Sequence, residues 1–226
     1  MTEAFPFLAR LLPLLFGVLF IGGLVGYRAA RFQRRYGHSP IHRPAAEDRS
    51  AHAFLSRTLV VYFLMILVLG GLVAIAPGAL EAVDLLFARH TAGFQGPGIV
   101  LALVAGGIVW RAQEDMAASW RIGIEATERT ELVTRGLFRF CRNPIYLGLQ
   151  LGLVAFACLV PGYLTLMMLV ASGFLFQVQA RLEEAYLLAR HGEAYALYCR
   201  KVGRFLPFTG RWPSERRSGG ARRLDA

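Results

Sequence analysis

Long apolar segments alternate with shorter polar ones along the whole chain, and this alternation is its main pattern. Most of the apolar segments are close to the roughly 20 residues of helix that cross a hydrocarbon core. Five of them are candidate membrane-spanning helices, at residues 7–26, 54–76, 98–112, 145–160 and 163–180. The third is the shortest, because Arg111 interrupts it, although its helix can continue past the membrane to about residue 120. The pattern predicts an all-α polytopic membrane protein with about five transmembrane helices.

The last two apolar segments are expected to form one hairpin with a polar cluster at each end. Pro161 and Gly162 are a turn signal between two helices of roughly 24 and 27 Å, at 1.5 Å per residue. A chain that crosses the bilayer, turns and crosses back brings residues 142–148 and 181–184 to the same face of the membrane. We therefore expect these two polar clusters to lie within reach of each other and to form a site.

The composition agrees with a membrane protein and disagrees with a soluble one. Of the 226 residues 55% are hydrophobic and the mean hydropathy is +0.45, yet the formal net charge is +10. The basic side chains lie at the ends of the apolar segments and in the tail, where they face anionic lipid. No base-reading motif accompanies them. We therefore expect membrane lipids, and no nucleic acid, as partners.

The arginines between the apolar segments predict an orientation. The loop between the first two segments carries Arg28, Arg31, Arg34, Arg35, Arg43, Arg49 and Arg57, and the loop before the fourth is equally basic. The N-terminal side has only Arg10, and residues 77–97 only Arg89. By the positive-inside rule the N-terminus lies outside, and the two basic loops and the C-terminus are cytosolic. Lys201 is the one lysine among 25 basic side chains, a bias typical of GC-rich genomes, so we expect a bacterial inner membrane.

Three regions follow from this organisation. Residues 1–97 hold the first two transmembrane helices and their loops. Residues 98–208 form the core, with the last three helices and a cytosolic helical site. Residues 209–226 form a basic tail, which we expect to be disordered. In the first region Gly22, Gly23 and Gly26 favour close helix packing.

The first polar cluster allows a structural and a functional interpretation. Asn143 can cap a helix that has Pro144 in its first turn, and Arg142 can anchor that helix at the membrane interface. The same helix N-terminus leaves backbone N–H groups that suit a carboxylate or another acceptor. Arg142 could complement such a ligand.

The second cluster consists of two adjacent glutamates at the end of an apolar helix. A helix C-terminus disfavours negative charge, so a specific reason for the pair is expected. Glu183 and Glu184 point about 100° apart, so only one of them can face a given pocket. One can pair with Arg181 or Arg142 while the other binds a cationic ligand. In the alternative, the helix simply emerges into water here.

Two tyrosines follow a predicted helix break near His191 and Gly192. Tyr195 and Tyr198 share a helix face, and aromatic rings beside carboxylates suit a sulfonium or ammonium ligand. They could equally be interfacial tyrosines. The cysteines show no metal spacing, and neither do the histidines of the first cytosolic loop, so we expect no metal; these histidines are His38, His42 and His52.

Four ordered elements resemble the isoprenylcysteine carboxyl methyltransferase and phospholipid methyltransferase superfamily. The family pattern is Arg-His-Pro-x-Tyr-x-Gly, an apolar hairpin, Glu-Glu, Gly-Glu-x-Tyr-x-x-Tyr and a closing Arg-x-x-Pro. In this chain the elements are residues 136–148, Glu183-Glu184, residues 192–198 and residues 202–207. The resemblance covers about residues 100 to 208. Asn143 stands where the carboxyl methyltransferases usually have His, so an imidazole-dependent role could not survive, whereas amide hydrogen bonding could.

The resemblance implies S-adenosylmethionine as cofactor, bound at the cytosolic ends of the last helices, and a lipophilic acceptor reached from the bilayer. One wall of the cofactor pocket would be Arg142, Asn143, Pro144, Tyr146 and Gly148. The other would be Glu184, Tyr195 and Tyr198, with Leu132, Val133 and Gly136 near the adenosine. By position alone, Arg142 or Arg204 is the candidate that orients the acceptor, and Glu183 or Glu184 the candidate acid/base or cofactor anchor.

The sequence thus predicts a membrane methyltransferase that acts on a hydrophobic small molecule or lipid. Methyl transfer from a sulfonium mainly requires aligned reactants and excluded water, which a pocket at a membrane boundary can provide. Two other functions stay open. One is a non-catalytic scaffold or carrier with the same fold, and the other is a related membrane reductase that uses a nicotinamide cofactor.

Overall fold

The protein is an all-α bundle. The computed structural model describes residues 7–40, 50–78, 87–120 and 131–213. Its long helices are α1 (Phe7–Ile21), α2 (Arg28–Tyr36), α3 (Ala51–Ile75), α5 (Phe87–Met116), α6 (Pro144–Leu159), α7 (Tyr163–His191) and α8 (Glu193–Lys201). The shorter ones are the π-helical η1 (Gly22–Tyr27) and the 3-10 turns η2 (Ala117–Ser119) and η3 (Gly136–Arg139). Among these described residues the structure has no strand, only an isolated parallel bridge between Cys141 and Gly203, which confirms the predicted fold class.

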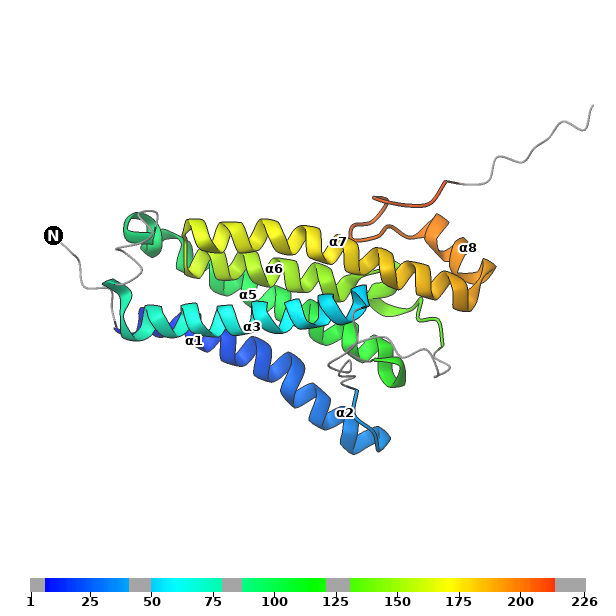
Figure 1. Ribbon diagram of the computed structural model, residues 1–226, viewed down its shortest axis with the longest axis horizontal. Coiled ribbons are helices and arrows are strands. Elements are labelled where there is room, and N and C mark those ends of the chain that lie inside the picture. The colour runs from blue at the N-terminus through cyan, green and yellow to red at the C-terminus, as the bar shows by residue number, and fades with distance from the viewer. Residues whose placement is uncertain (1–6, 41–49, 79–86, 121–130, 214–226) are drawn as a thin grey trace, which may run out of the picture.

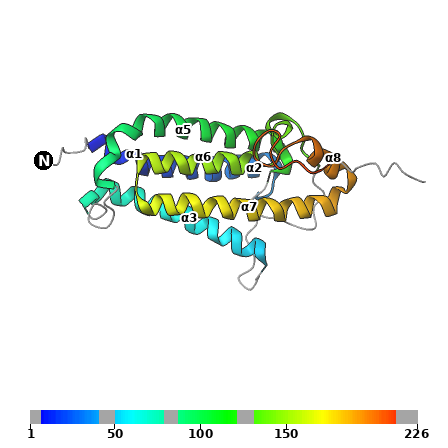
Figure 2. The same cartoon turned by 90° about the horizontal axis from the view of Figure 1, so that it is seen from above.

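The helices run back and forth along one long axis (Figures 1 and 2). Val160, Pro161 and Gly162 separate α6 from α7, as the turn signal predicts. The C-terminal ends of α5 and α7, the N-terminal end of α6, and α8 therefore share one end of the bundle (Figure 1). This brings the two polar clusters of the hairpin together, as expected from the sequence.

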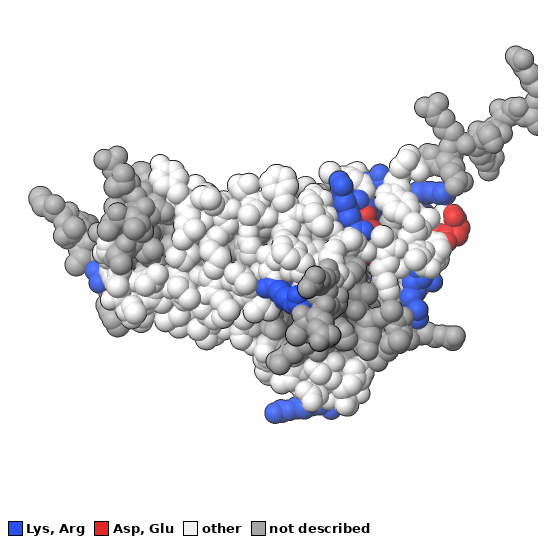
Figure 3. All heavy atoms as spheres, in the orientation of Figure 1, with Lys and Arg blue, Asp and Glu red and all other residues white. Residues whose placement is uncertain are grey.

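The helix lengths agree with about five membrane spans. Four ranges are long and apolar enough to cross a membrane: Ala9–Tyr36, Ala53–Ile75, Gly93–Met116 and Tyr163–His191. The helix α6 has 16 residues, which is about 24 Å. The third helix begins at Phe87, before the predicted residue 98, because it accommodates Pro97 in its interior. In Figure 3 the coloured charges lie mainly toward the end with α2 and α8, and the rest of the visible face is largely uncharged.

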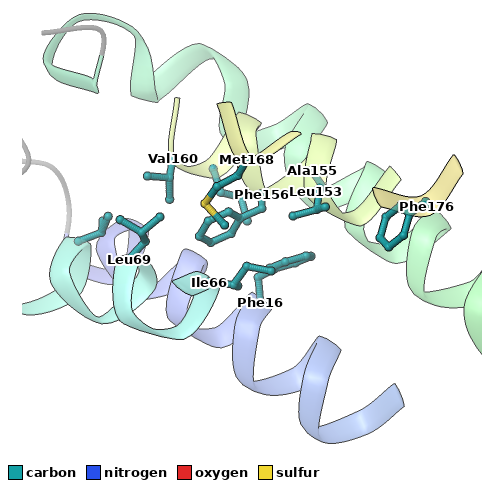
Figure 4. Packing of buried hydrophobic residues seen from close by; sticks show 11 residues of the cluster. Phe16, Ile66, Leu69, Leu153, Ala155, Phe156, Val160, Met168 and Phe176 are labelled. Carbon is teal, nitrogen blue, oxygen red and sulfur yellow. The ribbon is translucent and has the colours of Figure 1, made fainter. Parts of the chain in front are cut away.

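The core lies where α1, α3, α6 and α7 meet. Figure 4 shows Phe16, Ile66, Phe156 and Met168 pointing toward one another from these four helices. Outside this core many large apolar side chains are exposed on the bundle surface, as a lipid environment requires. Met167 and Leu103 are two of them.

A polar cluster fastens the first helix to α5 near the basic end. Arg28 donates from Nε to Gln113 Oε1 at 3.1 Å and pairs with Glu114. Its guanidinium lies over the rings of Trp110 and Trp120. The Nε2 of Gln113 donates to the carbonyl of Leu24, inside the π-helical turn. The cluster thus fixes the junction of α1 and α2 against α5.

Close helix contacts occur at other glycines than the sequence predicts. At Gly22, Gly23 and Gly26 a side chain would meet no described atom within 4 Å, so the packing prediction is wrong there. These residues form the π-helical turn instead. The close approaches lie at Gly70, whose added Cβ would be 2.9 Å from the Leu14 backbone, and at Gly148 against α5.

Candidate functional site

Arg142 lies at the centre of the polar end of the hairpin, and its side chain is only 1% exposed. Its Nε and Nη2 donate to Glu184 Oε1 at 3.1 and 2.8 Å. Its Nη1 donates to the carbonyls of Cys199 and Val202, and Nη2 also donates to that of Gly210. All five guanidinium N–H groups therefore have an acceptor within the protein.

Glu184 binds a second arginine as well. Arg204 donates from Nε to Glu184 Oε1 at 2.9 Å and from Nη2 to Oε2 at 2.8 Å. The Glu184 side chain is 6% exposed and that of Arg204 is 20% exposed. The hydrogen bonds with Glu184 raise the pKa of Arg204, which stays charged. Two arginines around one carboxylate leave one formal positive charge in this cluster of three residues.

The pairing of Glu184 with Arg142 is one of the predicted alternatives, and it is confirmed. The helix α7, however, continues to His191, so the two glutamates lie inside a helix and not at its C-terminus. The expected conflict with the helix dipole is therefore wrong. The helix break at Gly192, where φ is +51°, is confirmed.

The C-terminal segment is fixed to the start of α6 by backbone hydrogen bonds. Arg142 N donates to the Gly203 carbonyl at 2.9 Å, and Asn143 N to that of Arg204 at 3.0 Å. The segment folds so tightly that a Cβ on Gly203 would lie 2.0 Å from the carbonyl oxygen of Leu206. Arg204 is thereby held beside Arg142 although the two are 62 positions apart.

Asn143 is buried at the N-cap position of α6, but its side chain does not cap the helix. Its Nδ2 donates to the Arg204 carbonyl at 3.2 Å, so the predicted capping role is wrong. Pro144 occupies the first turn as predicted. The first N–H groups of α6 therefore donate no hydrogen bond to the Asn143 side chain.

Both predicted tyrosines are held within α8. Tyr195 is buried, with its ring 6.0 Å from that of Tyr198 and 6.4 Å from that of Trp212. Tyr198 donates its hydroxyl to the carbonyl of Phe138 at 2.5 Å. Burial raises the pKa of both phenols, so they remain neutral. The two rings thus pack between the C-terminal segment and η3.

Gly136 lies against Asp115, a residue that the sequence analysis missed. Its φ is +58°, and a Cβ there would lie 2.0 Å from the Asp115 carboxylate. Asp115 Oδ2 accepts from the backbone N of Leu137 at 2.8 Å, and Oδ1 pairs with Arg111 at 3.1 Å. The spacing of Arg111 and Asp115, four residues apart on a helix, was the available signal. The predicted Leu132 and Val133 are half-buried in the segment before this turn.

Glu183 belongs to a separate polar cluster. It accepts the hydroxyl of Tyr146, and Gln179 Nε2 donates to the same Oε1 at 3.1 Å. Gln179, a second missed residue, is 7% exposed, and its Oε1 has no partner among the described residues. A glutamine within an apolar helix was the sequence signal for it. The adjacent glutamates therefore face different partners, as their helical spacing predicts.

An apolar groove lies beside this cluster. It is small and lies between α1, α3, α6 and α7. Its lining residues are Phe16, Phe20, Leu59, Tyr62, Phe63, Ile66, Leu149, Gly152, Leu153 and Phe176. Phe176 stacks on Tyr146 with 5.4 Å between ring centroids, so the groove borders the glutamate cluster. Gly148, which is predicted to be part of the cofactor pocket, faces α5 and not the groove. A Cβ added to it would lie 2.6 Å from Val109.

No group of three or more metal-ligating side chains is present in the described parts of the chain. Of the histidines considered as ligands, His38 donates from Nδ1 to the Tyr36 carbonyl at 3.1 Å. His42 lies outside the described residues, as do residues 214–226 of the predicted basic tail.

Comparisons with known proteins give a family and a fold. A family model described as phospholipid methyltransferase matches residues 97–194. The eukaryotic intramembrane Ras methyltransferase, isoprenylcysteine carboxyl methyltransferase, has a similar structure, with a TM-score of 0.53 and 17% identity over 88% of this chain and 70% of that chain. A search of curated proteins finds no match. Residues 97–194 are therefore similar to the phospholipid methyltransferase family, and the chain has the fold of isoprenylcysteine carboxyl methyltransferase.

Proposed function

We propose that this chain is an S-adenosylmethionine-dependent methyltransferase that acts on a lipophilic acceptor at the cytosolic membrane boundary. The observation that carries the proposal is the meeting of two features on α6 and α7. A charged cluster of Arg142, Glu184 and Arg204 closes the polar end of these helices. An apolar groove between membrane-spanning helices approaches the same end. The phospholipid methyltransferase match covers both helices and supports this assignment.

The residues fit the charges of S-adenosylmethionine. The cluster around Glu184 has one formal positive charge left, and the first turn of α6 offers N–H groups, which together suit the cofactor carboxylate. The ring of Tyr146 suits a positively charged sulfonium. When bound, the cofactor supplies an activated methyl group. Leu132, Val133 and Gly136 stay predicted neighbours of the adenosine.

The arginines are not equivalent as ligands. Arg142 uses all its N–H groups on internal acceptors, so its role is to position α6, α7 and the C-terminal segment. Arg204 is more exposed and is therefore the better candidate for direct contact with an anionic group. The positive-inside rule places this end of the bundle in the cytosol, where the cofactor is available.

Two measurements test the proposal in protein reconstituted into nanodiscs. Calorimetric titration should detect S-adenosylmethionine binding, and Arg204→Gln and Glu184→Gln should each weaken it at least tenfold, roughly 1.4 kcal/mol. Glu193→Gln, which changes an exposed ion pair of α8, is the matched control and should leave the affinity unchanged. Methyl-labelled cofactor with a native lipid extract should yield a labelled lipid. Absence of binding by the folded wild-type protein would refute the proposal.

A further inference from the structure

The cluster around Glu183 contains an acceptor that no described residue satisfies. Gln179 is more than nine-tenths buried, and its Nε2 donates to Glu183, which fixes the orientation of the amide. The amide Oε1 therefore points away from the carboxylate and has no partner in the described structure. A buried acceptor without a donor costs roughly 1 to 3 kcal/mol. Such an atom indicates that a donor from outside the chain binds there.

The carboxylate of Glu183 offers a second acceptor at the same place. Tyr146 and Gln179 both donate to Oε1, which leaves Oε2 as the oxygen for a further donor. Glu183 is partly exposed, unlike Glu184. Among the described residues no arginine pairs with Glu183, and the nearby Arg142 and Arg204 both donate to Glu184. The cluster is therefore rich in acceptors and lacks a nearby cation.

The cluster continues the apolar groove along one face of α7. Phe176, Gln179 and Glu183 follow one another at spacings of three and four residues, so they lie on the same side of the helix. Phe176 lines the groove and stacks on Tyr146, which binds Glu183. A molecule with its apolar part in the groove would thus place its polar end at Gln179 and Glu183.

We propose that Gln179 and Glu183 bind the polar end of the methyl acceptor, and that this end is an N–H or O–H group, not a carboxylate. The inference rests on the proposed methyltransferase function and specifies its substrate class. A carboxylate would bring a second negative charge to Glu183 and would leave Gln179 Oε1 without a donor. A primary amine has N–H donors for both acceptors, and a hydroxyl has a donor for one of them. Isoprenylcysteine carboxyl methyltransferase shares the fold, but this site has the opposite polarity to one for a carboxylate.

The reaction then balances with Glu183 as the proton acceptor. The lone pair of the acceptor nitrogen or oxygen forms the new bond to the methyl carbon. The bond between that carbon and the sulfonium sulfur breaks, and its electron pair stays on sulfur. The proton of the acceptor passes to a carboxylate oxygen of Glu183 and afterwards to water. Tyr146 is a positioning residue, since its hydroxyl holds that carboxylate in place.

Three acceptors with the same long alkyl chain test the substrate class. They carry a primary amine, a hydroxyl or a carboxylate, and each is supplied in nanodiscs with methyl-labelled S-adenosylmethionine. The proposal expects transfer to the amine or the hydroxyl, and at least tenfold less to the carboxylate. Preferred transfer to the carboxylate would overturn it while leaving the methyltransferase function intact. If the wild-type protein bound no cofactor at all, the proposed function itself would fail.

Variants then test the residues. Glu183→Gln removes the proton acceptor with little change in shape, so kcat should fall about 100-fold while the cofactor Kd stays within twofold. Gln179→Leu should raise KM for the acceptor more than it lowers kcat. Tyr146→Phe should lower kcat with an unchanged melting temperature. Wild-type kcat in Glu183→Gln, or unchanged KM in Gln179→Leu, would contradict the assignment.

Discussion

Glu184→Gln should open the polar end of the hairpin, because it leaves two arginines without their shared carboxylate. The Arg142 side chain is 1% exposed and cannot reach water without moving α6 or the C-terminal segment. Breaking a buried ion pair by removing one partner costs about 3–5 kcal/mol. The contribution of Arg204 is smaller, since that side chain is 20% exposed and its charge is partly screened. We therefore expect a local loss of about 3 kcal/mol or more.

The rate at which the Cys199 thiol is alkylated measures this opening. It is fully buried, and its carbonyl accepts a hydrogen bond from Arg142. Burial raises the pKa of its thiol, and alkylating reagents attack the thiolate, so the closed protein should react slowly at neutral pH. In a background with Cys141→Ala and Cys158→Ala, a loss of about 3 kcal/mol should speed alkylation of Cys199 roughly 100-fold.

The comparison of single variants decides whether the reasoning holds. Arg142→Gln should speed the alkylation more than Arg204→Gln, because Arg142 also binds three backbone carbonyls. Glu193→Gln serves as the control, since its ion pair with Arg200 is exposed at the glutamate. If Cys199 were alkylated no faster in Glu184→Gln than in Glu193→Gln, the cluster around Glu184 would not be holding this end of the bundle closed. The argument from burial would then be refuted.

Three further outcomes are expected from the fold. Gly136→Ala should lower the free energy of unfolding by about 1–3 kcal/mol, because φ is +58° and Asp115 fills the space; a change under 0.5 kcal/mol would contradict this. Burial raises the pKa of Cys141 to about 11, so its alkylation rate should still rise about tenfold per pH unit above pH 9, and a plateau there would count against it. Gly148→Ala should lower the melting temperature more than Gly107→Ala. An added Cβ would lie 2.6 Å from Val109 at Gly148, whereas no described atom lies within 4 Å of one at Gly107.

The fold could be predicted from the sequence because membrane helices depend mainly on local composition. Each apolar segment satisfies its own backbone within one helix, so its existence does not require a partner to be known. The turn at Pro161 and Gly162 then fixes the return of the chain and the meeting of the two polar clusters. The start of α5 was missed because Pro97, an expected helix breaker, is tolerated inside a helix of 30 residues.

The side-chain partners could be predicted only in part. The helical angle between Glu183 and Glu184 is a local property, so their different orientations were foreseeable. The contact of Gly136 with Asp115 joins residues 21 positions apart through the packing of η3 on α5, and no local pattern encodes it. The same holds for the carbonyls of Cys199, Val202 and Gly210 that surround Arg142.

The adjacent glutamates show how one helix can hold two carboxylates with different partners side by side. Glu184 is bound by two arginines at distances of 2.8 to 3.1 Å, so its charge is fully used in joining α6, α7 and the C-terminal segment. Glu183, about 100° around the helix, has only neutral donors, and these can release it during a reaction without breaking an ion pair. A carboxylate that must accept a proton needs such surroundings, because a paired arginine would hold it ionised. The physical division between the two residues therefore follows from their partners, although their side chains are identical.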